Sequence, residues 1–215
     1  MKNDVIIRFT VPALLMAVSF AALAVFFVFN FAGPAGNQFT ASLPRQLVLY
    51  GRLAGILCAL LFLSQFLMLN RKRCGSDSEA KAKLARWHGV VGFTILGLLA
   101  IHVFLIFRGR SMLNGESFWA SFIDFCGDGG WGSFTLLGLL TVFFLLTCCV
   151  LMLAGKLRLA VWRKSHFLIY LAVIPIFGHQ VFCGYDFISN WVFRVFWILL
   201  FAFVLANVIL RRLMR

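Results

Sequence analysis

The sequence predicts an all-α integral membrane protein, a bundle of six transmembrane helices with both termini in the cytoplasm. Of the 215 residues, 62% are hydrophobic and only 13% are charged, and the mean hydropathy is +0.97. Soluble domains are about 45–50% apolar and about 25% charged. Six apolar runs approach the roughly 20 residues that a helix needs to cross a bilayer. In chain order they are residues 9–31, 44–70, 87–107, 132–154, 165–183 and 191–210.

The basic residues predict the orientation of this bundle. The net charge is +13, and Lys and Arg flank the apolar runs, which indicates topology and contact with anionic lipid rather than binding of nucleic acid. If the N-terminus is cytoplasmic, 15 of the 20 Lys and Arg residues lie on the cytoplasmic side. We therefore expect one domain over residues 1–215 in the cell membrane, most simply a bacterial inner membrane.

The first two runs differ in their polar content. Residues 9–31 follow a short basic stretch and are longer than the apolar core of a secretory signal peptide, so we expect a retained span. Residues 44–70 contain Arg52 about two helical turns from the outer end. A topology signal does not require a basic residue at that depth.

The third run, residues 87–107, contains two histidines and no other ionisable group between them. His88 and His102 are 14 residues apart, which on a helix leaves them about 40° apart around the axis and about 21 Å apart along it. Gly92 lies on the same stripe. A polar side chain in a membrane segment is by default a candidate functional residue.

The fourth run follows the longest loop, residues 109–131. Within this loop the stretch FWASFIDF, residues 118–125, is expected to form a short helix at the membrane interface. Cys126 in this loop and Cys183 at the outer end of the fifth run both face the outer side, where thiols tend to be oxidised. We expect a disulfide between them; the alternative is two free thiols.

The fifth run, residues 165–183, contains a second pair of histidines. His166 and His179 are 13 residues apart, so an ideal helix would place them about 140° apart around its axis. Pro175 lies between them, and a proline kinks or rewinds a helix, which allows both rings to reach one face. The sixth run, residues 191–210, is followed by a basic end.

The four histidines fall at two matched depths. The third and fifth spans run in the same direction, so His88 is level with His166, and His102 with His179. Two imidazoles that face each other across a helix interface form the axial ligand set of a bis-histidine haem. Zinc or copper is disfavoured, because two imidazoles alone leave a small metal under-coordinated. The alternative roles are packing and proton relay.

Two segments carry a family resemblance. HGVVGFTILGLLAIH (His88–His102) and WRKSHFLIYLAVIPIFGH (Trp162–His179) resemble the ferric reductase-like transmembrane domain of NADPH oxidases, ferric-chelate reductases and the haem subunit of the periplasmic methionine sulfoxide reductase. Both histidine spacings match, as do the glycine at position 92 and the tryptophan at position 162. The resemblance covers about residues 45–210. It implies two b-type haems ligated by His88, His102, His166 and His179.

The resemblance also implies an electron path from a cytoplasmic donor to an outer acceptor. Many relatives continue into a flavin- and nicotinamide-binding module, whereas here the sixth run is followed by only five residues. We therefore expect FAD or FMN only through a separate partner; the alternative is that this sequence is a piece of a longer protein. The donor would be a flavoprotein reductase or a quinol. The acceptor would be a ferric chelate, dioxygen or a periplasmic redox protein.

Two other functions are open at this point. One is a haem-binding redox subunit that exchanges electrons between a quinol or flavoprotein and a periplasmic reductase, with no substrate of its own. The other is a haem-free channel that uses the histidines as a proton path. A relay of that kind predicts further intramembrane acidic or Lys side chains, and the spans contain none clearly.

Basic and glycine residues complete the candidate site. Haem propionates are anions that attract Arg, and we expect Arg86 and Arg163 at the inner haem and Arg52 at the outer haem or its acceptor. The alternatives are topological anchoring for the first two and snorkelling for Arg52. Gly92 and Gly97 would leave room for a porphyrin against the helix, or allow close packing of helices.

Overall fold

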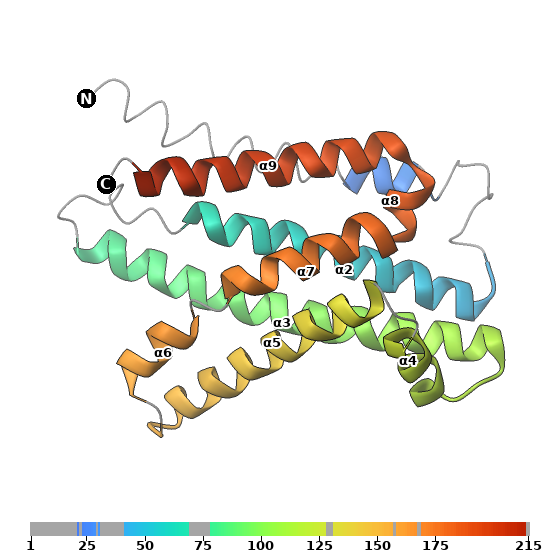
Figure 1. Ribbon diagram of the computed structural model, residues 1–215, viewed down its shortest axis with the longest axis horizontal. Helices are drawn as coiled ribbons and strands as arrows, with labels where there is room; N and C mark the ends of the chain where they lie inside the picture. The colour runs from blue at the N-terminus through green and yellow to red at the C-terminus, as the bar shows by residue number, and fades with distance from the viewer. Residues whose placement is uncertain are drawn as a thin grey trace. The chain divides into compact units, whose positions relative to one another are not determined.

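The computed structural model describes residues 21, 23–28, 30, 41–68, 78–127, 131–156, 158–166 and 169–213. Every regular element among these residues is an α-helix, as the sequence predicts. The first predicted span, residues 9–31, lies mostly outside the described residues, although residues 21, 23–28 and 30 are helical. The other helices (Figure 1) are α2 (Leu43–Met68), α3 (Ser78–Asn114), α4 (Phe118–Gly127), α5 (Trp131–Leu153), α6 (Leu159–His166), α7 (Ile169–Cys183), α8 (Tyr185–Ser189) and α9 (Trp191–Leu213).

Helices α2, α5 and α9 begin within one residue of the second, fourth and sixth predicted runs. Helix α3 is longer than its apolar run at both ends. Its first turns, SEAKAKLAR, are polar but rich in Ala, Lys and Glu, which are strong helix formers. The helix ends where Gly115 adopts a positive φ of 70° and the backbone N–H of Glu116 donates to the carbonyl of Ser111 (3.0 Å). That arrangement is a Schellman stop.

In the fifth predicted run, the structure describes helix up to His166, in α6, and again from Ile169, in α7; residues 167–168 are not among those described. The prediction that His166 and His179 share one span therefore stays a prediction. Pro175 lies inside α7 and is buried.

Two of the described helical stretches are long and apolar enough to cross a membrane, by length and composition. They are Leu43–Phe66 in α2 and Ala82–Asn114 in α3. The apolar stretches Ile174–Cys183 and Trp191–Ala206 are shorter. The remaining spans of the six-helix bundle, and the location of the termini, stay predictions.

The chain divides into two compact units. The first unit comprises residues 1–118 and 196–215, and the second comprises residues 119–195. The first therefore contains α2, α3 and most of α9. The second contains α4 from Trp119 onward, α5 to α8, and the first residues of α9.

In the first unit, α2 and α3 pack side by side in antiparallel register (Figure 1). Gly51 of α2 lies against Ile106 of α3, and Gly55 lies against His102. Nearer the first residues of α2, Gly109 of α3 meets the backbone of α2. Because glycine lacks a Cβ atom, the two backbones approach closely at these positions.

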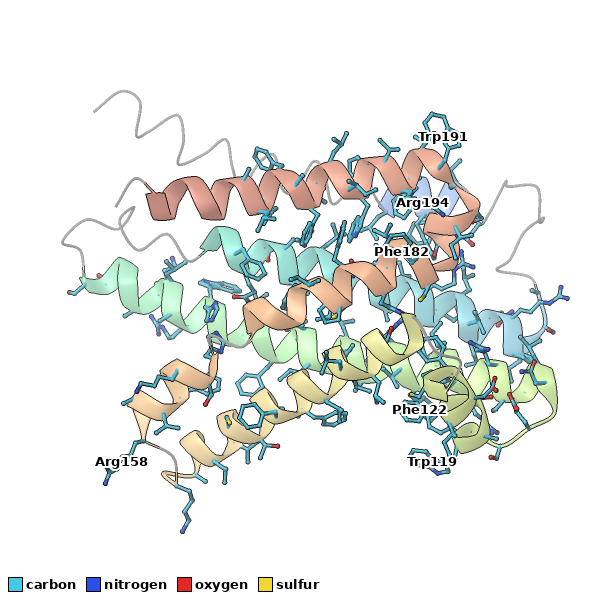
Figure 2. The ribbon with its side chains drawn as sticks, viewed as in Figure 1. Trp119, Phe122, Arg158, Phe182, Trp191 and Arg194 are labelled. Carbon is cyan, nitrogen blue, oxygen red and sulfur yellow. The ribbon has the colours of Figure 1, made fainter. Side chains whose placement is uncertain are left out.

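In the second unit, α5 packs against α6 and α7, and α7 packs against α8. Pro175, Gly178 and Val181 form the buried side of α7, at a spacing of three residues. The short helix predicted for residues 118–125 is confirmed as α4. Its Trp119 is 67% exposed, and Trp191 at the start of α9 is 74% exposed. Both indole rings point away from the ribbon in Figure 2.

The packing of α2 on α3 predicts that Gly55→Ala destabilises the fold. A Cβ atom at position 55 would lie 2.7 Å from Nδ1 of His102, so the imidazole must move, and such overpacking costs about 1–3 kcal/mol. Thermal unfolding of the purified protein in detergent measures the effect. The matched control is Gly97→Ala on α3, where a Cβ meets nothing within 4 Å and alanine favours the helix by up to about 1 kcal/mol. Equal unfolding temperatures for Gly55→Ala and the unmodified chain would contradict the prediction.

Candidate functional site

His102 is held by the backbone of α2. Its Nδ1 atom lies 2.8 Å from the carbonyl oxygen of Gly51, and Gly55 lies against the ring. A carbonyl oxygen only accepts hydrogen bonds, so Nδ1 carries the proton and donates it. In the neutral imidazole this leaves the lone pair on Nε2, the atom through which histidine binds a metal in this tautomer.

His179 is held by a side chain. Its Nδ1 atom lies 2.9 Å from Oγ1 of Thr135, in the first turns of α5. The ring of Phe125, from α4, meets the imidazole edge to face, with the ring centroids 6.1 Å apart and the planes at 90°. A hydroxyl both donates and accepts hydrogen bonds, so this contact by itself is compatible with either tautomer of His179.

The other two histidines have different surroundings. The backbone carbonyl of His88 accepts a hydrogen bond from Nε2 of Gln65 (3.2 Å), a buried residue of α2. The ring of His166 lies 4.8 Å from the ring of Trp162, one turn earlier in α6. The Nδ1 atoms of both histidines are buried.

The predicted level pairs combine histidines of the two units. His88 and His102 belong to the first unit, and His166 and His179 to the second. The structure describes the surroundings of each ring within its own unit. The pairings of His88 with His166 and of His102 with His179 therefore stay predictions.

Gly92 and Gly97 of α3 lie on different faces of the helix. Among the described residues, a Cβ atom at Gly92 would meet nothing within 4 Å. Gly92 lies on the stripe of His88 and His102. At Gly97 a Cβ atom would also meet nothing. That residue is nine positions after His88, about 180° around the helix, so it does not share the face of the histidines.

Arg52 is fixed inside the first unit. Its Nη2 donates a hydrogen bond to Oδ1 of Asn30 (2.9 Å), and its guanidinium carbon lies 5.7 Å from the ring centroid of Phe26. Asn30 is only 2% exposed, and its Nδ2 donates to the carbonyl of Phe26 (2.9 Å). The guanidinium therefore binds a buried partner rather than snorkelling. Arg52 follows Gly51, whose carbonyl holds His102.

The structure gives less detail on Arg86 and Arg163, the other two residues predicted to bind haem propionates. Arg86 is an exposed residue of α3, two positions before His88. Arg163 lies in α6, and its side chain lies outside what the structure describes.

The expected disulfide is not formed. Cys126 and Cys183 are both free thiols of intermediate exposure. Burial raises the pKa of the Cys126 thiol above its usual value, which disfavours the thiolate that disulfide formation requires. The prediction of a Cys126–Cys183 link is wrong for this structure.

Three residues of the site were not found by sequence reasoning. Gly51 and Gly55 form a small-xxx-small pattern within an apolar run, which is a known signal for close helix contact and was available in the sequence. Thr135 carries no comparable signal, because a threonine near the start of an apolar helix usually bonds its own backbone.

Among the described residues, no three or more His, Cys, Asp or Glu side chains gather into a group that could hold a metal ion. A bis-histidine haem uses only two protein ligands per iron. Comparisons of the chain with protein-family models, with curated proteins and with solved structures give no match.

The free thiols lead to a labelling prediction. Denatured protein, treated with iodoacetamide without prior reduction, should be alkylated at both Cys126 and Cys183, as mass spectrometry of the digest would show. In the folded protein, labelling of Cys126 should be slow at neutral pH and accelerate as the pH rises toward its raised pKa, because the thiolate is the reactive form. A cross-linked peptide that contains both cysteines would contradict the prediction.

Proposed function

We propose that the chain is a membrane cytochrome that binds two b-type haems and carries electrons from one side of a bilayer to the other. The observation that carries the proposal is the state of His102. Its Nδ1 donates to the carbonyl of Gly51, so the lone pair of the ring is on Nε2. Metal-binding histidines in proteins almost always donate their other N–H to a carbonyl, carboxylate or water in this way.

Room for a flat ligand on the histidine face supports the same function. Gly92 lies on that face, and the space beside its Cα is open. The glycines at Gly51, Gly55 and Gly109 serve helix contacts, whereas a Cβ atom at Gly89, Gly92 or Gly97 of α3 would meet nothing within 4 Å among the described residues. Of these three, Gly92 lies on the stripe of His88 and His102, where a porphyrin plane beside the helix would account for it.

The apolar surface supports a bilayer location. Helix α3 carries exposed apolar side chains at Trp87, Val90, Phe93, Ile101 and Phe104, a spacing that repeats along one side of a helix. Contiguous apolar surface of this kind marks contact with a membrane or a partner. The long apolar stretches of α2 and α3 agree with a membrane protein. We assign it to a bacterial inner membrane, with several spans.

As the sequence predicts, His88 and His166 would ligate the inner haem, and His102 and His179 the outer haem. Arg86 and Arg163 would bind propionates on the inner side, and Arg52 on the outer side. When bound, the haems supply one-electron chemistry. The chain would orient the imidazoles of His102 and His179 through their Nδ1 atoms, and its apolar side chains would exclude water; both would set the redox potential.

The electron donor and acceptor are proposed from the resemblance to ferric reductase-like membrane domains. The donor is a flavoprotein reductase or a quinol. The acceptor on the outer side is a ferric chelate, dioxygen or a periplasmic redox protein. The purified, reduced chain tests the acceptor directly. Oxidation by a ferric chelate or dioxygen alone supports a substrate of its own, whereas oxidation only by a partner protein supports the redox-subunit alternative.

Haem stoichiometry is the decisive test of the function. The purified chain should contain two low-spin haems per polypeptide, measured by pyridine haemochrome and protein determination. His102→Leu or His179→Leu should each remove one haem and leave the other with its spectrum unchanged, because each replaces one ligand of the outer site. A folded full-length preparation with at most one haem would overturn the two-haem assignment.

Substitution of Gly92 tests the haem face without disturbing packing within the chain. Gly92→Leu places its side chain in open space, so the haem-free protein should keep its unfolding temperature, while haem retention should fall below that of the unmodified chain. Gly97→Leu is the matched control, on the opposite face of the same helix, and should retain both haems. Full haem content in Gly92→Leu would show that the porphyrin does not lie there.

A further inference from the structure

We infer that Thr135 is a positioning residue for the outer haem, whose hydroxyl accepts the hydrogen bond from Nδ1 of His179 and so sets the strength of that ligand. The inference rests on the proposed function. It concerns a residue for which neither the sequence nor the resemblance gives a role.

The direction of the hydrogen bond follows from the chemistry of ligation. Oγ1 of Thr135 and Nδ1 of His179 are 2.9 Å apart, which is a good hydrogen-bond distance. If His179 binds iron through Nε2, that nitrogen has no proton, so Nδ1 carries it and donates. The hydroxyl is then the acceptor. Its own proton remains available for a carbonyl one turn earlier in the helix, a common arrangement for helical threonine.

The ring of His179 is also restrained from a second helix. Phe125 of α4 meets it edge to face at 90°. Thr135 of α5 and Phe125 of α4 thus contact one imidazole from different elements of the second unit. The contact with Phe125 can limit rotation of the imidazole ring. The contact with Thr135 is a hydrogen bond, so it can also change the electronic properties of the ring.

The hydrogen bonds of the two proposed outer histidines therefore differ in whether a side-chain substitution can remove them. His102 donates to a backbone carbonyl, which no side-chain substitution at Gly51 removes. His179 donates to a side chain, and substitution can delete that acceptor. An acceptor at Nδ1 raises the basicity of the ligand and stabilises ferric iron. Loss of the acceptor should therefore raise the reduction potential of the outer haem and weaken its binding.

The experiment compares three variants of the full chain with the haems bound. Thr135→Val is nearly isosteric and removes the acceptor, whereas Thr135→Ser keeps it. The matched control is Thr147→Val in the same helix, where the hydroxyl donates to the carbonyl of Phe143 (2.9 Å) and is exposed. The readouts are a potentiometric titration followed by visible spectra and the g-values of the ferric haems in electron paramagnetic resonance.

Thr135→Val should raise the potential of one haem, shift its g-values, and weaken its retention by about 10- to 100-fold, the usual range for loss of a partner of a metal ligand. Thr135→Ser and Thr147→Val should match the unmodified chain. In a His102→Leu background, which should keep only the inner haem, Thr135→Val should leave the remaining potential unchanged. Two haems with unchanged potentials and g-values in Thr135→Val would overturn the inference.

If Thr135→Val does not fold, a further variant tests the same inference. Thr135→Cys replaces the oxygen with sulfur, a weak acceptor, and should shift the same haem in the same direction by a smaller amount. No shift in a folded Thr135→Cys protein also overturns the inference. If the unmodified chain binds no haem, the proposed function itself fails. If it binds two and the Thr135 variants change neither, only the inference fails.

Discussion

The contact of His102 with α2 is the interaction on which the first unit and its candidate site both depend. Gly55 leaves the space that the imidazole fills, and the carbonyl of Gly51 accepts its Nδ1 proton. One side chain thereby packs two helices and fixes its own tautomer. Gly55 gives room to this ring and Gly51 gives room to Ile106, which explains why two glycines stand one turn apart in α2, where each lowers intrinsic helix stability. Any larger residue at Gly55 would displace the ring.

Two polar side chains of α2 bond to groups outside their own helix. Nε2 of Gln65 donates to the carbonyl of His88, and Arg52 donates to Asn30. In hydrocarbon an unpaired polar group costs several kcal/mol, so such pairs also fix the register of neighbouring helices. The pair of Arg52 and Asn30 joins α2 to the helical residues before it, near the level at which Gly51 holds His102.

The sequence predicts features that depend on local patterns of residues, but not contacts that depend on how helices pack. Apolar runs predict where helices begin, as for α2, α5 and α9, because burial in lipid or protein needs length and hydrophobicity alone. They did not predict the polar extension of α3 from Ser78, where helix propensity decides. Histidine spacing indicated candidate ligands. The acceptors of their Nδ1 protons, Gly51 and Thr135, come from neighbouring helices, which no local pattern specifies.

His102 and His179 illustrate how one kind of side chain can be supported in two physical ways. A backbone carbonyl in a helix has a fixed dipole, and its position depends only on the packing of α2 against α3. A threonine hydroxyl can rotate, and its acceptor strength depends on where its own proton is bonded. Substitution during evolution can remove the hydroxyl but not the carbonyl. If the chain binds two haems as proposed, the carbonyl at Gly51 would provide a constant ligand field, and position 135 would be where the potential of the haem bound by His179 is adjusted.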